Sequence, residues 1–491
     1  MQKVKITCPP KFFLGRRGEN LKFLRLKSQA GSVLIFNVVL IFIFSAVMLG
    51  VLSYAVVQLR VIRSSVNREV AFQIAEAGVN YYQWHLAHFP TDYFDGNAST
   101  TPGPYVHNFV DTDTNQKIGE YSLEISSPPV GSTVVTIKST GYTTENPSQK
   151  RSITIRYGVP SLAKYAFLTN TDVWIGNTET VNGEMHANGG IRFDGIGNAP
   201  IKSSKPNIPP GPGYKCYWYH GCNNPFQWKP GIWGSAATST RNYWKMSEPN
   251  VDFASLTANL QTLETLADGQ TDLPPSNAQG YSLVFNSNGT VSVYKVTSLR
   301  SHQTGHDVNG GAHNEDLDYQ NRSFQYTINL PTNGVIFVKD HVWVEGVVNG
   351  RVVVGATKYS TNPNLQARIL IPNNLTYLAK DGSHSLGLIA EKDILITYFA
   401  PSNLEINGAL IAQKGSAQRY DFSGNTKTSL NLFGSVASFG VWTWSWVNGS
   451  NQCVSGYCTT STTYDANLLY YPPPSFPLSS EGYRQLSWSS D

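Results

Sequence analysis

The sequence predicts an α+β fold in which one long N-terminal helix precedes a small antiparallel sheet and a large β-rich region. A charge-free apolar segment continues into a proline-free segment that ends before Pro90, which is typical of a single helix over residues 32–89. Short alternating apolar runs with Gly and Asn between them follow the helix, as expected for strands. The composition is 12% aromatic and only 14% charged, against roughly 25% charged in average soluble proteins, which favours an exported β-rich protein.

The first half of the predicted helix is long enough to cross a membrane. Residues 28–59 contain no charged side chain, and the apolar run 32–57 exceeds the ~20 residues that span a bilayer. It is also longer than the apolar core of an ordinary secretory signal. Residues 1–31 hold eight basic residues against one acid, so the positive-inside rule predicts export of everything after Arg60. A plain signal anchor is the alternative interpretation.

The second half of the helix is expected to be amphipathic. Residues 60–89 contain no proline, and their apolar positions recur at spacings of three and four. These positions are Val66, Val70, Ile74, Ala77 and Tyr81. A helix that is half apolar and half amphipathic suits a subunit that stacks its helix beside copies of itself or of related chains.

The charge distribution argues against a nucleic-acid binder. The net charge is +4, but without residues 1–31 the chain carries 29 basic and 32 acidic residues. A nucleic-acid interface needs a basic face on the folded part of the chain. The sequence therefore predicts no nucleic-acid partner.

The N-terminal segment resembles that of PilX-type minor pilins. The resemblance rests on the basic leader that ends at Gly31, the charge-free run, and the segment VAFQIAEAG at residues 70–78. It implies that a prepilin peptidase removes leader 1–31 and that the new N-terminal amine, on Ser32, is methylated. It also implies an inner-membrane precursor that later joins other pilin or minor pilin subunits through its helix.

One departure from the family pattern concerns the fifth residue after the implied cut. Main pilins carry Glu there, whereas this chain has Phe36. A carboxylate in lipid is expensive unless it is paired. A subunit with no neighbour above it has no use for that carboxylate, so Phe36 favours a minor or tip subunit.

The region after the helix is expected to form β domains. Residues 90–160 alternate in the manner of an antiparallel meander, which would be the small sheet of a pilin-like head. Residues 161–330 would begin the large body, interrupted over 199–330 by loops and a helix near 251–266. Short rungs with Gly/Asn corners predict an irregular parallel β-solenoid there and over 331–491, with a β-sandwich as the alternative.

A second resemblance covers roughly the region from 330 to 490. The blocks GVIFVKDHVWVEGVVNGRVVV, HSLGLIAEKDILI and ALIAQKGS resemble an uncharacterised domain that follows pilin-like N-termini in bacterial surface proteins. This resemblance implies architecture and no activity.

Four cysteines follow the implied cut, in two close pairs. Two local disulfides are the expected arrangement in an exported chain, although cross-pairing or one zinc site formed by both pairs stays open. The pairs are Cys216 with Cys222 and Cys453 with Cys458.

Potential metal ligands gather in one Gly- and Asn-rich loop, for which a solvated loop is the favoured interpretation. The candidates are His302, His306, Asp307 and His313, with Glu315, Asp316 and Asp318 nearby. The sequence holds no G-x-S-x-G, H-E-x-x-H or Walker motif. We therefore expect no catalytic residue, cofactor or resident metal.

Together these features predict a minor or tip subunit of a type IV pilus or related pseudopilus. Its helix would join the filament, and its β-rich body would be displayed outside the cell for structure or adhesion to a host, surface or glycan receptor. A membrane-anchored surface solenoid that never enters a filament is the alternative. A polysaccharide-acting enzyme is a further and weaker alternative.

Overall fold

The computed structural model describes residues 30–491 except 209–212, 218–219, 223, 254–258, 302–303, 309, 315, 449 and 451. The chain separates into two compact units, one ending at Glu69 and the other spanning Val70–Asp491. The implied leader 1–31 lies almost wholly outside the described residues.

A single helix, α1 (Ala30–His88), contributes to both units. Its sequence contains no proline, and Val, Leu, Ile, Phe and Ala dominate its first half. The helix stops two residues before Pro90, whose ring disfavours helical geometry at the preceding residue. The long N-terminal helix predicted over 32–89 is therefore present.

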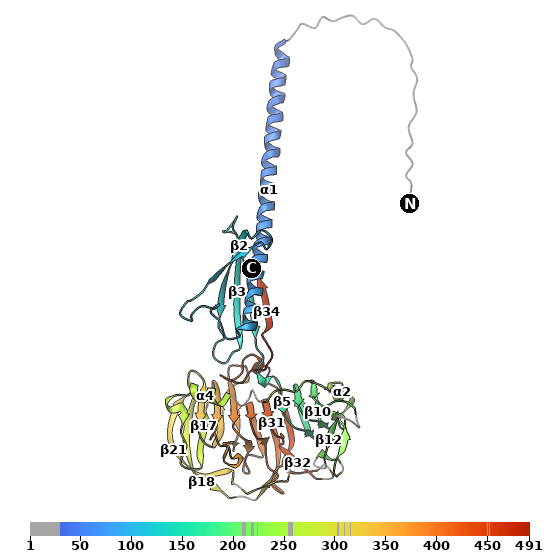
Figure 1. Cartoon of the computed structure of the whole chain (residues 1–491), viewed down its shortest axis with the longest axis vertical. Helices are drawn as coiled ribbons and strands as arrows, with labels where there is room; N and C mark the ends of the chain where they lie inside the picture. The colour runs from blue at the N-terminus through green and yellow to red at the C-terminus, as the bar shows by residue number, and fades with distance from the viewer. Residues whose placement is uncertain are drawn as a thin grey trace, which may run out of the picture. The chain divides into compact units, whose positions relative to one another are not determined.

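Within the second unit, α1 lies against a five-stranded antiparallel sheet, called here the small sheet (Figure 1). Its strands, in spatial order, are β1 (Tyr105–Val110), β2 (Lys117–Ser126), β3 (Val134–Thr143), β4 (Arg151–Gly158) and β34 (Arg484–Ser490). The antiparallel meander predicted after the helix is confirmed. The pairing of β34 with β4 was not anticipated, because sequence patterns placed all of 331–491 in the body.

The predicted helical periodicity is present in α1. However, the face of the helix that is buried is displaced by about one residue from the predicted face. Ile74 is buried as predicted, but Val66 is exposed. Ala71 and Ala75 are buried as well, each one residue after a predicted position. Small residues explain the shift. A Cβ on Gly141 of β3 would lie 2.2 Å from the Ala71 carbonyl oxygen, so the helix backbone rests directly on the strand.

The remaining described chain, residues 161–480, forms a β-rich region called here the body. Its first ladder is parallel throughout: β16 (Asp272–Leu273), β22 (Val335–Val338), β24 (Arg351–Ala356), β27 (Ser385–Ala390), β29 (Asn403–Ala412), β31 (Thr426–Ser438), β5 (Phe167–Thr169), β8 (Met185–Ala187), β11 (Ile201–Ser203) and β15 (Trp244–Lys245). Its second ladder is also parallel and joins β17 (Gly280–Asn286), β23 (Val342–Val348), β26 (Leu375–Tyr377), β29, β31, β33 (Cys453–Thr463), β7 (Glu179–Asn182) and β10 (Ile196–Gly197).

Shorter parallel sets complete the stack. One joins β23 to β25 (Ile369–Ile371), β28 (Ile394–Ile396) and β30 (Ala417–Gln418), and another contains β6 (Val173–Ile175), β9 (Ile191–Phe193) and β14 (Ile232–Trp233).

The body also contains antiparallel hairpins and short helices beside its parallel ladders. The hairpins pair β17 with β18 (Thr290–Arg300), β18 with β21 (Asp318–Asn329), β12 (Tyr214–Cys216) with β13 (Gln227–Lys229), β19 (Gly305–His306) with β20 (Ala312–His313), and β32 (Ser445–Val447) with β33. The helices are η1 (Leu162–Lys164), α2 (Thr238–Arg241), α4 (Asn259–Leu266), η3 (Gly269–Thr271), η4 (Pro363–Leu365) and η5 (Ala466–Leu469). Leu263 of α4 is fully buried against Phe337 and Val353, as expected for a helix lying on the strands.

The spatial order of the strands differs from their order in the sequence. β5 pairs with β31, so the segment that begins the body stacks on a segment near its other end. The incoming and outgoing connections consequently run side by side. Ser161 N donates to Leu469 O at 2.9 Å, and Ser479 N donates to Pro160 O at 2.9 Å. The body is thus an insertion between β4 and β34 of the small sheet.

Candidate functional site: the exposed half of the helix and a pocket beside the chain crossing

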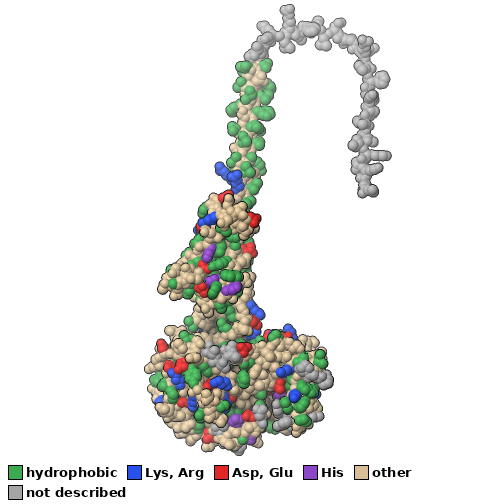
Figure 2. Space-filling view, in the orientation of Figure 1, with side chains coloured by type: hydrophobic (Ala, Val, Ile, Leu, Met, Phe, Trp, Pro, Cys, Tyr) green, Lys and Arg blue, Asp and Glu red, His purple; other side chains and the backbone are tan. Residues whose placement is uncertain are grey.

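The first candidate site is the apolar half of α1. Every residue from Val33 to Arg63 is exposed, and the window of the helix that best fits a membrane span is 0% buried. By length and composition, this helix can cross a membrane. In Figure 2 its apolar side chains cover the helix up to the first cations. Burial of apolar surface is worth roughly 25 cal/mol per Å², so these side chains require lipid or a partner protein.

The implied processing residues fall at the start of this helix. Gly31 and Ser32 belong to α1, but the environment of their side chains lies outside the described residues. Phe36 is 64% exposed, and the described helix carries no charge before Arg60. The apolar half therefore contains no carboxylate that would need a partner in lipid.

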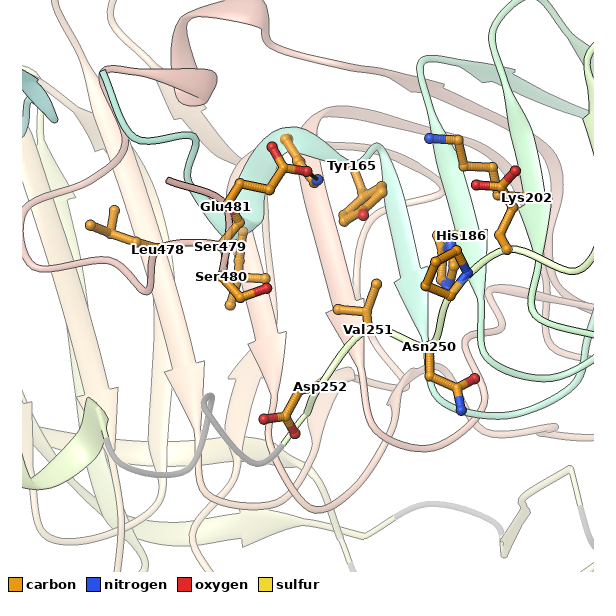
Figure 3. Close-up of a pocket in the computed structure, with 14 residues that line it drawn as sticks. Tyr165, His186, Lys202, Asn250, Val251, Asp252, Leu478, Ser479, Ser480 and Glu481 are labelled. Atoms are coloured by element: carbon orange, nitrogen blue, oxygen red, sulfur yellow. Dashed lines mark hydrogen bonds and ion pairs between the residues drawn. The ribbon is translucent and has the colours of Figure 1, made fainter. Parts of the chain in front are cut away.

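The second candidate site is a pocket of about 550 Å³ beside the crossing of the two connections (Figure 3). The incoming connection supplies Lys164 and Tyr165, and the outgoing connection supplies Glu481. The ladder strands β8 and β11 supply His186 and Lys202. The other wall is the segment from Glu248 to Asp252. Figure 3 shows Asn250, Val251 and Asp252 of this segment below Tyr165 and His186.

The two lysines of this pocket are each paired with a glutamate. Lys164 forms an ion pair with Glu481, and Lys202 Nζ lies 2.7 Å from Glu184 Oε1. Burial opposes ionisation of Glu481, but the hydrogen bond and the charge of Lys164 outweigh it and lower its pKa. Burial lowers the pKa of His186, so this ring is neutral at pH 7. The Lys164–Glu481 pair joins the incoming and outgoing connections at the crossing.

The His/Asp loop is braced by its own contacts. His313 Nε2 lies 2.9 Å from Asp307 Oδ2, and the His313 ring stacks on Tyr420 at 4.2 Å. His306 pairs through its backbone with Asp421 of a neighbouring segment. His302 and Glu315 lie outside the described residues. Among the described residues, no group of three His, Cys, Asp or Glu side chains is arranged to hold a metal ion.

The cysteines form two local disulfides, Cys216–Cys222 and Cys453–Cys458. The first closes the loop between β12 and β13, and the second lies within β33. These are the pairs expected from their spacing in the sequence.

Sequence patterns missed the residues that join the small sheet to the body. The Arg351 Nη2 atom donates to the carbonyl oxygens of Gly131 at 2.7 Å, Tyr471 at 2.5 Å and Pro472 at 2.7 Å. Arg351 Nη1 donates to Gly382 O at 3.0 Å. A lone arginine in a β strand carries no local signal of such a role, because its partners come from three distant segments.

Comparisons with known proteins give little. No family model and no curated protein matches the chain. Among solved structures, the competence-associated pilin ComZ from Thermus thermophilus aligns at 14% identity with a TM-score of 0.29, covering 87% of this chain and 97% of that chain. At that TM-score the likeness carries no argument.

Proposed function

We propose that this chain is a subunit of a type IV pilus or a related pseudopilus and that it assembles through α1. The observation that supports this proposal is one uninterrupted helix with two environments. Its first half is charge-free and fully exposed, and its second half is packed on a small antiparallel sheet. Such a helix can reside in a membrane and can later be buried by neighbouring helices without refolding.

The proposed sequence of events begins with cleavage after Gly31 by a prepilin peptidase and methylation of the Ser32 amine. The helix then resides in the inner membrane, with the β-rich part on the outer side. Extraction transfers the apolar half of α1 from lipid to the sides of other pilin helices. Phe36 in place of a carboxylate supports a minor or tip position, where no neighbour lies above to pair with it.

The body supports a display role in this proposal. We infer that its parallel ladders are the faces of an irregular β-solenoid, in which each circuit of the chain adds a strand to each ladder. The parallel register fits this architecture better than an antiparallel sandwich. A body of this size suits a tip or sparse position with an adhesive or structural role, and we propose no catalysis.

N-terminal peptide mass spectrometry on a sheared surface fraction tests the proposal. The expected peptide begins at Ser32 and carries one added methyl group. A Gly31→Leu variant, which alters only the residue before the cut, should retain the uncut leader and disappear from the sheared fraction. Wild-type protein found only in membranes, with Met1 intact, would overturn the pilus proposal and support a membrane-anchored surface protein.

A further inference from the structure

A second pocket lies where the two distant parts of the body meet. Its volume is about 140 Å³, close to the ~150 Å³ of a cavity that holds one benzene ring. One wall comes from Trp174, Glu179 and the turn between them, in the segment that begins the body. The other wall comes from residues 441–447, which precede β33. β33 and β7 pair in parallel directly beside the pocket, with Thr460 opposite Glu179.

Three tryptophans line this pocket in fixed positions. Trp174 Nε1 donates to Asp194 Oδ2 at 2.8 Å, and Trp446 Nε1 donates to Arg419 O at 2.9 Å. Trp442 packs on Phe167 with ring centroids 4.1 Å apart. Unlike the other two, the buried Trp442 Nε1 has no hydrogen-bond partner among the described residues. Its accessible area is below 1 Å², so a ligand in the pocket meets the half-buried rings of Trp174 and Trp446 rather than this N–H.

Glu179 adds a neutral carboxyl group to the pocket. Its Oε2 accepts a hydrogen bond from Gly176 N at 3.2 Å, which opposes but does not cancel the effect of burial. Burial raises its pKa to about 8, so the group is mostly protonated at pH 7 and can both donate and accept. Asn177, Thr178, Thr443 and Ser445 place further amide and hydroxyl groups on the lining.

Both disulfides brace segments that line this pocket. Cys216–Cys222 closes the loop that contains His220, a lining residue whose pKa is lowered to about 4 by burial and by nearby Arg192. Cys453 stands opposite Val447, another lining residue, in the β32–β33 pairing. Two independent cross-links at one small pocket are what a preorganised binding site requires.

We propose that this pocket binds one neutral pyranose ring, as found in a hexose unit of a glycan. The half-buried indole rings of Trp174 and Trp446 offer apolar surface for the C–H side of a sugar, while the neutral carboxyl and the lining hydroxyls pair with its hydroxyl groups. The volume admits a single six-membered ring. This proposal deepens the display role suggested above, but the binding itself does not depend on processing of the leader or on assembly.

A cationic ligand fits the pocket less well. Aromatic cages that hold quaternary ammonium groups rely on ring faces and negative charge. Here the Arg192 guanidinium already lies 4.0 Å over the Trp174 ring, and Glu179 is neutral at pH 7.

The test is calorimetric titration of the full-length chain in detergent with the methyl glycosides of glucose, galactose, mannose and N-acetylglucosamine, and with choline. We expect saturable binding of at least one glycoside. Trp446→Ala, which removes a half-buried indole ring from the lining, should weaken binding about tenfold. Trp488→Ala, on β34 of the small sheet, is the matched control and should leave affinity unchanged.

Glu179→Gln separates the ligand classes. Because glutamine preserves a neutral donor and acceptor, glycoside affinity should change less than threefold, whereas Glu179→Ala should lower it by at least tenfold. Circular dichroism checks that each variant is folded.

Three results would overturn the proposal: binding of none of the glycosides, binding of choline alone, or equal glycoside affinity of wild type and Trp446→Ala. A peptide that begins at Met1 would overturn the pilus proposal and leave these titrations unaffected.

Discussion

The small sheet and the body differ in how their strands bury side chains. Strand β3 of the small sheet alternates between buried and half-buried residues, because one face meets α1 and the other meets solvent. Strand β27 of the body is buried at all six positions, because neighbouring strands and the core enclose it. A half-covered sheet can be recognised from its own sequence, whereas an enclosed strand reveals little about its neighbours.

The largest expected effect in this comparison comes from truncating a side chain in the body. Leu388 of β27 is fully buried, and Leu388→Ala should lower the free energy of unfolding by about 3–4 kcal/mol. Denaturant unfolding followed by tryptophan fluorescence measures it. The exposed Leu365→Ala is the matched control and should stay within about 0.5 kcal/mol. Equal effects at the two sites would contradict the enclosed core.

The small sheet is sensitive to added volume where α1 rests on β3. A methyl group on Gly141 would meet the backbone of α1, so Gly141→Ala should cost about 2–3 kcal/mol and expose the helix half that packs on the sheet. Hydrogen exchange over residues 70–88 is the readout. Gly482, which has open space around it, gives the control Gly482→Ala. Unchanged protection in Gly141→Ala would show that the helix does not rest on β3.

Arg351 joins the two regions, and its loss should uncouple them. Arg351→Ala leaves the Gly131 and Gly382 carbonyl oxygens without this donor and should cost about 2 kcal/mol. Scanning calorimetry should then resolve two transitions in place of one coupled transition. The exposed Arg484→Ala removes only a surface ion pair with Glu481 and should leave the transition unchanged. A single unbroken transition in Arg351→Ala would place the coupling elsewhere.

The smallest expected effect is an opposite response of the two regions to pH. The pKa of Glu179 is raised from 4.5 to about 8, so the folded body holds this proton longer and loses stability as pH rises through that interval. Burial works against Asp92, but hydrogen bonds from Phe94 N, Gly96 N and His85 lower its pKa below 3.8. The small sheet therefore keeps this contribution above pH 3.8 and loses it as pH falls through the lower folded pKa.

Region-resolved hydrogen exchange between pH 2 and pH 8 measures both slopes after correction for the intrinsic exchange rate. Glu179→Gln should flatten the slope of the body, and Asp92→Asn should flatten that of the small sheet at the acidic end. Identical slopes in wild type and variants would contradict the assignment of these two groups.

The contrast also explains what the sequence could predict. Helix periodicity, the alternation in β2 to β4 and the cysteine spacing are local, so α1, the meander and the disulfide pairs could be anticipated. The pairings of β31 with β5 and of β34 with β4 join segments far apart in the chain, and no local pattern encodes them. The pocket of Trp174 and Trp442 exists only because of such a pairing, and it was missed for that reason.

The same interleaved order has a consequence for synthesis. Ribosomes add about 5–20 residues per second. The strand β5 is therefore synthesised tens of seconds before its partner β31, and β4 precedes its partner β34 by still longer. During that interval both segments present unpaired strand edges, which are templates for aggregation. A nascent chain of this topology therefore keeps these edges unpaired until both partner strands have been made.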